Sequence, residues 1–106
     1  MIATPNLHYI EEISENDIPF QRKLIAIIKE EFPKEKESFL KNIHLKEFHA
    51  ASENIHKLKH KINLFGMNEG YLIANQMEIE LREKKLNSYP QLLTVLLTVE
   101  SFLKQI

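Results

Sequence analysis

The chain contains no cysteine, and it has only two glycines and four prolines among its 106 residues. Without cysteine it can form neither a disulfide framework nor a zinc site built on thiolates, and nothing indicates an oxidising compartment. The scarcity of glycine and proline, together with little strand-like alternation, predicts that helices carry nearly all of the structure. We therefore expect an all-helical protein.

The sequence also lacks an excess of one charge and a long apolar run. Its 14 Lys and Arg residues nearly balance 15 Asp and Glu residues, and a net charge of -1 gives no general attraction to nucleic acid or to an anionic membrane. No apolar run approaches the roughly 20 residues of a membrane helix, and residues 1–20 lack the basic and apolar regions of a signal peptide. We expect a soluble cytoplasmic monomer without a nucleic-acid or membrane partner.

The length and composition fit one compact domain. A chain of 106 residues can bury one core, whereas two independent cores would be difficult to stabilise at this size. The hydrophobic share of 43% and the charged share of 27% are those of an ordinary globular protein. We therefore treat 1–106 as a single domain.

The apolar periodicity predicts five helices. The pattern indicates a short opening helix over 7–13, longer helices over 19–43, 48–65 and 69–86, and a last helix after Pro90. Four long amphipathic helices with short connections favour antiparallel neighbours, so we expect an up-down four-helix bundle with a short extra N-terminal helix. The predicted core includes Phe20, Leu24, Ile27, Ile28, Phe32, Phe39, Leu40, Ile43, Phe48, Ala51, Ile55, Leu58, Ile62, Phe65, Ile73, Ala74, Met77, Leu81, Leu92, Val95, Leu96, Val99, Phe102, Leu103 and Ile106.

Several residues predict where these helices begin, end or bend. The stretch Asn16-Asp17-Ile18-Pro19 is typical of a helix start, because a side-chain oxygen can cap free N–H groups and proline fits the first turn. Pro33 lies inside the second helix, and we expect a kink there without a break. Gly66 can close the third helix in the left-handed conformation, and Asn68 can cap the fourth.

The segment around His56 holds the chemistry-bearing side chains. Because Ile55 belongs to the apolar stripe, His56 lies about 100° around the helix, at the edge of solvent. Cations beside a histidine disfavour imidazolium, and the neutral ring that results is a nucleophile. An ammonium one turn away could also stabilise negative charge on a transferring phosphoryl group. The neighbouring cationic and imidazole side chains are those of Lys57, Lys59, His60 and Lys61.

Four positions in and just after this segment match a known pattern. His56, Leu58 and Lys59, followed by Gly66 ten residues after the histidine, resemble the signature of histidine-containing phosphotransfer (HPt) domains. The similarity extends over the whole chain. Its further parts are the Asn16-Asp17 helix start, the proline within the second helix, and the Met77-Glu78 pair one helix after the histidine.

The resemblance implies a site and a partner. It implies that His56 accepts the phosphoryl group, that Lys59 contacts the phosphate, and that Glu78 forms a hydrogen bond to the ring. It also implies a carrier that is no complete enzyme, needs no cofactor, and exchanges phosphate with receiver domains of response regulators or hybrid histidine kinases. The surface expected to face the receiver comprises Lys57, His60, Lys61 and Asn63, and Gly66 marks the helix end.

One position departs from the family pattern. The family most often has glycine immediately after the lysine, where the partner approaches closely, and this chain has His60. Two roles are open for this ring: its bulk can obstruct receivers shaped for glycine, or its imidazole can donate a hydrogen bond to the phosphate or to the partner. We favour selection among receivers, because a residue at an interface rim usually changes which partner binds.

Two other functions are compatible with the sequence. His49, Glu53, His56 and His60 follow one helix face, and Glu53-x-x-His56 matches the motif of di-iron bundles, although a second such pair is missing. Adventitious binding of zinc or nickel to the His56 and His60 pair is more to be expected than a native metal site. The other alternative is a helical bundle that binds partners without transferring phosphate.

Overall fold

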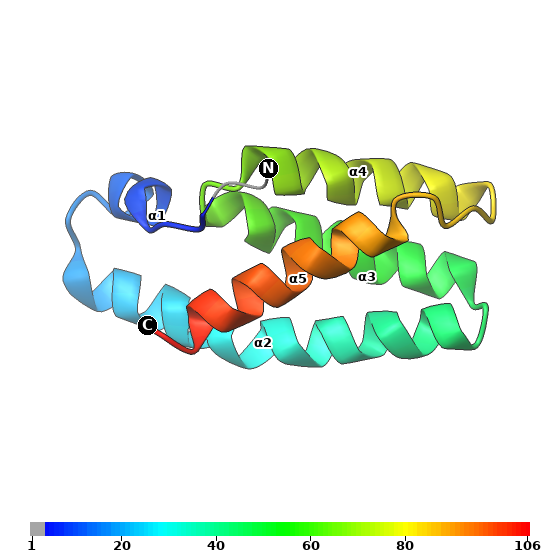
Figure 1. Ribbon diagram of the computed structural model, residues 1–106. Helices are drawn as coiled ribbons and strands as arrows, with labels where there is room; N and C mark the ends of the chain where they lie inside the picture. The colour runs from blue at the N-terminus through cyan, green and yellow to red at the C-terminus, as the bar shows by residue number, and fades with distance from the viewer. Residues whose placement is uncertain (1–3) are drawn as a thin grey trace.

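The computed structural model describes residues 4–106, and these residues form a four-helix bundle with a short additional helix at the N-terminal side. The helices are α1 (His8–Ile13), α2 (Ile18–His44), α3 (Phe48–Leu64), α4 (Asn68–Arg82) and α5 (Tyr89–Leu103). Successive long helices run in opposite directions, and α5 crosses the bundle obliquely, while α1 covers one end (Figure 1). The described residues contain no strand, so the predicted fold class is confirmed.

The helix starts and ends follow from local hydrogen bonds. Asp17 caps α2 by accepting a hydrogen bond from the Phe20 amide at 3.0 Å, as the sequence predicts. Gly66 closes α3 with a φ of 74°, also as predicted. The prediction for Asn68 is wrong, because Asn68 is the first residue of α4 and gives no side-chain cap. The proline at position 33 lies inside α2, which continues through it as one helix.

The fourth helix is shorter than predicted. It ends at Arg82, and Lys84 adopts the left-handed conformation with a φ of 59°. The Lys84 and Lys85 amides bond back to the carbonyls of Leu81 and Glu80, at 3.1 and 2.9 Å, which closes the helix. A lysine in this conformation leaves no clear signal in the sequence, so periodicity alone extended the helix to Leu86.

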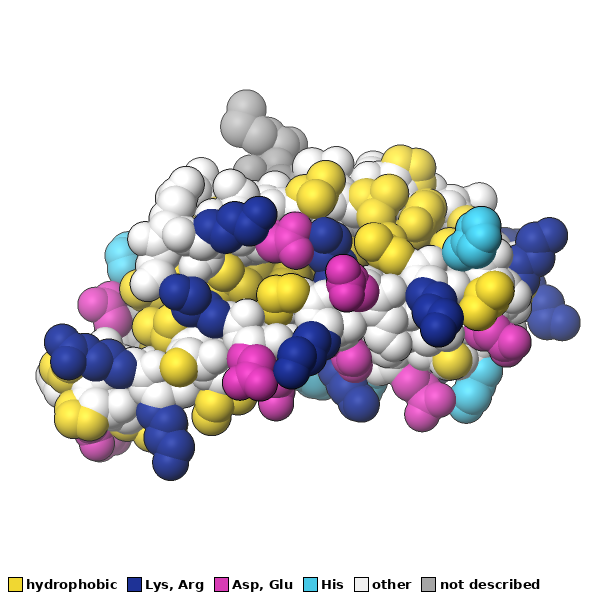
Figure 2. Space-filling view, turned by 90° about the horizontal axis from the view of Figure 1, so that it is seen from below, with side chains coloured by type: hydrophobic (Ala, Val, Ile, Leu, Met, Phe, Trp, Pro, Cys, Tyr) yellow, Lys and Arg dark blue, Asp and Glu magenta, His cyan; other side chains and the backbone are white. Residues whose placement is uncertain are grey.

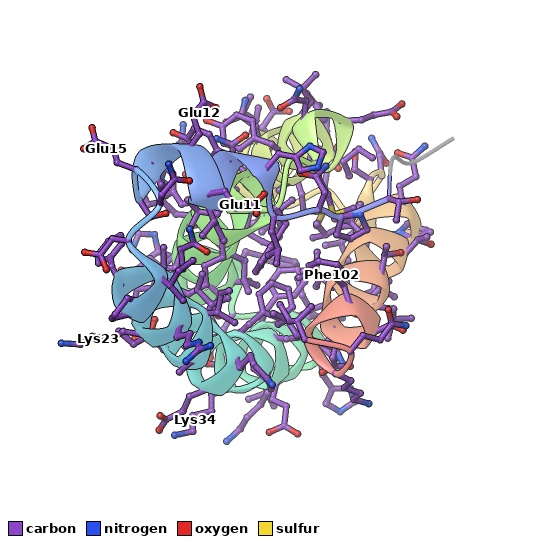
Figure 3. The ribbon with its side chains drawn as sticks, turned by 90° about the vertical axis from the view of Figure 1, so that its left-hand side faces the viewer. Glu11, Glu12, Glu15, Lys23, Lys34 and Phe102 are labelled. Atoms are coloured by element: carbon purple, nitrogen blue, oxygen red, sulfur yellow. The ribbon has the colours of Figure 1, made fainter. Side chains whose placement is uncertain are left out.

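The core lies between the four long helices and joins all of them. Seen end on, Phe102 points into the bundle, whereas Glu12, Glu15, Lys23 and Lys34 point outward (Figure 3). All but three of the predicted core residues line it, with Leu24, Leu40, Phe48, Ile73 and Phe102 partly buried against it. Burial of the third helix stripe fixes the rotation of α3. The fully buried members of that stripe are Ala51, Ile55, Leu58, Ile62 and Phe65.

Three predicted core positions are wrong. Phe20 is exposed in the first turn of α2, and Ile27 is exposed because its neighbour Ile28, only 2% exposed, takes the core-facing position in that turn. Ile106 is exposed beyond the end of α5. Acidic and basic side chains are interspersed on the face in Figure 2, which agrees with the balanced composition. Among the helices of residues 4–106, none is long and apolar enough to cross a membrane.

Candidate functional site

His56 lies near the middle of α3 and faces solvent. The burial of Ile55 and Leu58 sets the rotation of the helix, so His56 points away from the core. Its side chain is 56% exposed, as the sequence predicts. An exposed ring is accessible to a second protein, which a buried one would not be.

Glu78 reaches the His56 ring from the neighbouring helix α4. Its Oε2 atom lies 3.2 Å from the Nδ1 atom of His56, whereas its carboxylate is almost completely buried. Because the carboxylate can only accept a hydrogen bond, Nδ1 of His56 carries the ring proton and donates the hydrogen bond. Nε2 then keeps its lone pair. The contact between His56 and Glu78 is the one that the family resemblance implies.

Lys59 is buried, unlike the exposed ring one turn before it. Its Nζ atom lies 2.9 Å from Glu78 Oε1 and donates a hydrogen bond to Asn75 Oδ1 at 3.1 Å. The ammonium also lies 5.8 Å from the centre of the Tyr71 ring. The lysine side chain is only 10% exposed, so its charge is balanced inside the interface of α3 and α4. The sequence indicated a cation beside His56 but not this burial.

Arg82 also contacts Glu78 and was not predicted from the sequence. Its Nη2 atom lies 3.3 Å from Glu78 Oε2, the oxygen that also faces His56, and its side chain is 69% exposed. Arg82 follows Glu78 by four positions on α4, and this spacing was a signal that could have identified it. Asn75, which holds Lys59, was missed as well, since its contact spans 16 positions along the chain.

The charges around Glu78 determine its protonation. Burial disfavours its charged form and would raise the pKa, but the ammonium of Lys59 and the His56 ring outweigh burial, so the pKa of Glu78 is lowered from 4.5. The carboxylate is therefore ionised near neutral pH and remains a hydrogen-bond acceptor for Nδ1.

His60 lies beside the His56 ring. The ring centres of His56 and His60 are 5.1 Å apart, and the planes meet at 84°, edge to face. His60 is exposed, one turn along α3 toward α1. The residue that departs from the family pattern is thus in direct contact with the candidate acceptor.

The other residues expected to face a receiver point in two directions. Lys57 and Lys61 extend toward α2, where they lie 3.7 Å from Glu35 and 3.3 Å from Glu31. Asn63 and Gly66 lie at the other end of the site and line a hollow beside α1. That hollow is lined by Asn6, His8, Tyr9, Glu12, Asn63, Gly66 and Asn68.

A second hollow lies directly beside His56. It is lined by the imidazole of His56, the carboxylate of Glu78, the guanidinium of Arg82 and the side chain of Lys57. The remaining lining residues are His49, Ser52 and Glu53. The hollow combines a nucleophilic ring with cations and polar groups, which suits an anionic group on its way to the ring.

The four residues of the predicted metal bundle do not form one cluster. His49 faces Glu53 at 3.6 Å, and His56 faces His60. In residues 4–106 no group of three or more His, Asp or Glu side chains could hold a metal ion. The structure therefore lends no support to a di-iron type of site on these residues.

Comparison with protein-family models, curated proteins and solved structures finds no match to this chain.

Proposed function

We propose that this chain is a histidine-containing phosphotransfer domain that carries a phosphoryl group on His56 between receiver domains of a two-component phosphorelay. The observation that carries this proposal is the contact between His56 Nδ1 and the buried Glu78 carboxylate. It holds an exposed imidazole in one tautomer, with the lone pair of Nε2 directed away from the carboxylate. The motif of His56, Leu58, Lys59 and Gly66 supports the same function by resemblance.

The transfer step is a substitution at phosphorus. Nε2 of His56 attacks the phosphorus of a receiver's aspartyl phosphate, the bond from phosphorus to the aspartate oxygen breaks, and the new N–P bond forms. The ring keeps its Nδ1 proton and becomes cationic, and the adjacent Glu78 carboxylate stabilises that charge. Transfer to the next receiver reverses these changes. The divalent metal that assists the reaction belongs to the receiver in this proposal.

The cations around Glu78 take different parts. Lys59 is the phosphate-contacting residue by resemblance, and its ion pair with Glu78 also fixes the carboxylate that orients the ring. Arg82 is bound to the same carboxylate but is exposed, so its guanidinium can turn toward a phosphoryl group with little loss of packing. Together they balance the negative charge that arrives with the phosphate.

The domain is proposed to act as a carrier and not as a complete catalyst. Phosphoryl transfer depends on positioning and charge stabilisation, and one exposed histidine with two cations supplies only part of both. The receiver must supply the rest. We propose that the chain needs no cofactor of its own and works as a cytoplasmic monomer.

Phosphate uptake by the purified protein tests the proposal. A receiver domain carrying phosphate, or phosphoramidate as a small donor, should give acid-labile phosphate on the wild-type chain. His56→Gln should abolish the label and keep the helical circular dichroism, because position 56 lies outside the core. Glu78→Ala should retain slower uptake, since Glu78 orients the ring and does not react.

The control is His44→Gln, which removes an exposed histidine at the end of α2, outside the residues that line the hollow beside His56. It should be labelled like the wild type. Full labelling of the His56→Gln protein would disprove the assignment of the acceptor. Absence of label on the folded wild-type chain with every receiver of its source organism would leave the partner-binding bundle as the better reading.

A further inference from the structure

The carrier function gives His60 no chemical task, although its ring touches that of His56. Both rings are exposed, and they come from successive turns of one helix. Histidines spaced by four on a helix can share one metal ion, since neutral imidazole is a good ligand for divalent transition metals.

The separation of the rings agrees with a shared ion. Zinc binds imidazole nitrogen at about 2.0–2.1 Å with tetrahedral angles, which places the centres of two coordinated rings roughly 5 Å apart. The observed separation of the ring centres is 5.1 Å. The planes now meet edge to face at 84°. A turn of the exposed His60 ring about its own side chain is therefore the main adjustment needed to direct a nitrogen at the ion.

The surroundings of His56 also fit a metal ligand. Histidines that bind metals usually donate their other ring N–H to a carboxylate, which fixes the ring and increases its basicity. Nδ1 of His56 has this partner in Glu78 Oε2, at 3.2 Å. The arrangement that leaves Nε2 free for phosphorus therefore leaves the same lone pair free for a metal ion.

The local charge does not prevent a cation from binding. Lys59 is paired with Glu78, and Lys57 lies 3.7 Å from Glu35 on α2. The hollow beside His56 also contains Glu53, which offsets the exposed Arg82. The positive charges closest to the two rings are thus largely balanced by carboxylates.

We propose that His56 and His60 together bind one zinc-class divalent ion, with water in the remaining positions, and that this ion blocks phosphoryl acceptance. Blocking follows because the ion and the phosphorus atom require the same lone pair on Nε2. The blocking half rests on the proposed phosphotransfer function, whereas the binding half stands without it. Two protein ligands make the site reversible, as an inhibitory site must be.

Calorimetric titration of the purified chain with Zn²⁺ tests the binding half. The wild-type protein should bind one ion per chain, and Mg²⁺, which prefers oxygen ligands, should give no comparable heat. His60→Ala should weaken Zn²⁺ binding by at least the roughly 10- to 100-fold that loss of a supporting residue costs at metal sites. His44→Ala removes an exposed histidine at the end of α2, outside the hollow beside His56, and it should keep the wild-type affinity.

Phosphoramidate labelling tests the blocking half, because this donor transfers its phosphoryl group to Nε2 with release of ammonia. Each protein is compared with itself, with and without Zn²⁺ at a concentration that saturates the wild type. Zn²⁺ should reduce the labelling rate of the wild type and of His44→Ala by tenfold or more. The ratio of the two rates should approach one for His60→Ala. Wild-type protein that already carries phosphate should no longer bind Zn²⁺ at this site.

Three results would overturn the proposal. The first is that the wild type and His60→Ala bind Zn²⁺ with equal affinity. The second is that one ion binds per two chains, and the third is that Zn²⁺ at saturation leaves the labelling rate of the wild type unchanged. Failure of the phosphotransfer function itself looks different. In that case no phosphate is acquired in the absence of Zn²⁺, while the binding half remains supported by the effect of His60→Ala on affinity.

Discussion

Glu78 joins three side chains that carry, or can carry, positive charge. Its two oxygens face His56, Lys59 and Arg82, at 3.2, 2.9 and 3.3 Å. Two of these partners are exposed, whereas Lys59 and the carboxylate itself are almost fully buried. Substitutions around one carboxylate should therefore have different effects: those at the exposed partners change chemistry, and those at the buried pair also change stability.

Lys59→Ala should destabilise the fold as well as slow phosphotransfer. The substitution leaves the buried Glu78 carboxylate with one cation fewer, and breaking a pair of this kind costs about 2 to 3 kcal/mol even when other partners remain. Urea unfolding at neutral pH measures the loss. Lys59→Met keeps the packing of the stem and removes only the charge, so it separates the two contributions.

Lys85→Ala serves as the exposed control for this measurement. Lys85 lies 3.2 Å from Glu83 with both side chains more than half exposed, so its loss should change stability by no more than about 0.5 kcal/mol. If Lys59→Ala were as mild as Lys85→Ala, the buried pair would contribute little to the fold. The burial of Lys59 would then not make its ion pair important for stability.

His60→Gly should widen the set of receivers that accept phosphate from His56. The ring of His60 stands against the acceptor and would obstruct a receiver surface shaped for glycine. Glycine inside a helix costs about 1 kcal/mol, so His60→Ala is needed to separate helix stability from the loss of bulk. Phosphotransfer from each variant to a panel of receivers gives the profile.

An unchanged receiver profile would contradict the selective role of His60. If transfer to the cognate receiver also fell strongly, His60 would be acting in the chemistry itself. These assays contain a zinc-selective chelator, which leaves the divalent metal of the receiver in place, so that the two proposed properties of His60 are measured separately.

Part of the site could be predicted from single residues. The exposure of His56 followed from the apolar stripe of α3, and the match to the family motif pointed to Glu78. The partners of Lys59 could not be predicted, because Asn75 lies 16 positions away on another helix and its contact depends on how α3 and α4 pack. Periodicity gives the face of one helix but not the side chains that meet across two.

The connection between α4 and α5 is stabilised by the buried carboxylate of Glu80. Glu80 accepts hydrogen bonds from the backbone amide and the hydroxyl of Ser88, both at 2.7 Å, and from Gln76 at 3.2 Å. Burial disfavours its charged form and would raise the pKa, but the hydrogen bonds from Ser88 and Gln76 outweigh burial, so the pKa of Glu80 is lowered from 4.5.

This contact makes the fold sensitive to acid. A carboxylate with a lowered pKa stabilises the fold above its unfolded pKa of 4.5, and the contribution is lost as the pH falls through the lowered folded value. Glu80→Gln should cost about 1 to 3 kcal/mol at pH 7 and should lose less stability than the wild type between pH 5 and the acid limit. Urea unfolding across this range measures both effects.

Glu83→Gln is the matched control, because Glu83 is exposed at the end of the same helix. It should leave the acid limb of the stability curve unchanged. If Glu80→Gln and the wild type lost the same free energy of unfolding below pH 5, Glu80 would not be responsible for the loss of stability in acid.

Helix ends were less predictable than helix bodies. The starts and ends marked by Asp17 and Gly66 were found because their side chains, or the lack of one, are typical of these positions. The ends at Lys46 and Lys84 were not marked, since both residues adopt the left-handed conformation without being glycine. In such cases the tertiary structure imposes the turn, and composition gives no indication of it.

At the scale of the whole molecule, the bundle could be predicted because four amphipathic stripes with short breaks permit few arrangements. Two of the misplaced core residues, Phe20 and Ile27, lie on α2, and the third, Ile106, lies beyond the end of α5. Which of several neighbouring apolar residues faces the core depends on how the helices pack together. The pattern of a single helix cannot show that.

The proposed monomer has a definite size in solution. The Cα radius of gyration is 13.9 Å, and the molecule measures 42 × 26 × 20 Å along its axes. Small-angle scattering at low concentration should give a radius slightly above this value, since a hydration layer adds to it. Light scattering should give a molar mass near 12.5 kDa. A mass twice as large, independent of added metal, would contradict the monomer.

The segment before α1 is tied to the end of the helix that carries His56. The Asn6 amide donates to the Phe65 carbonyl at 2.9 Å, and the Asn6 side chain rests against Gly66, where an added Cβ would come within 2.8 Å of its Nδ2 atom. A backbone amide outside the helices usually exchanges with deuterium rapidly. Here the Asn6 proton should exchange only when this segment lifts from α3. Its exchange rate in deuterated solvent therefore reports how often that end of the bundle opens.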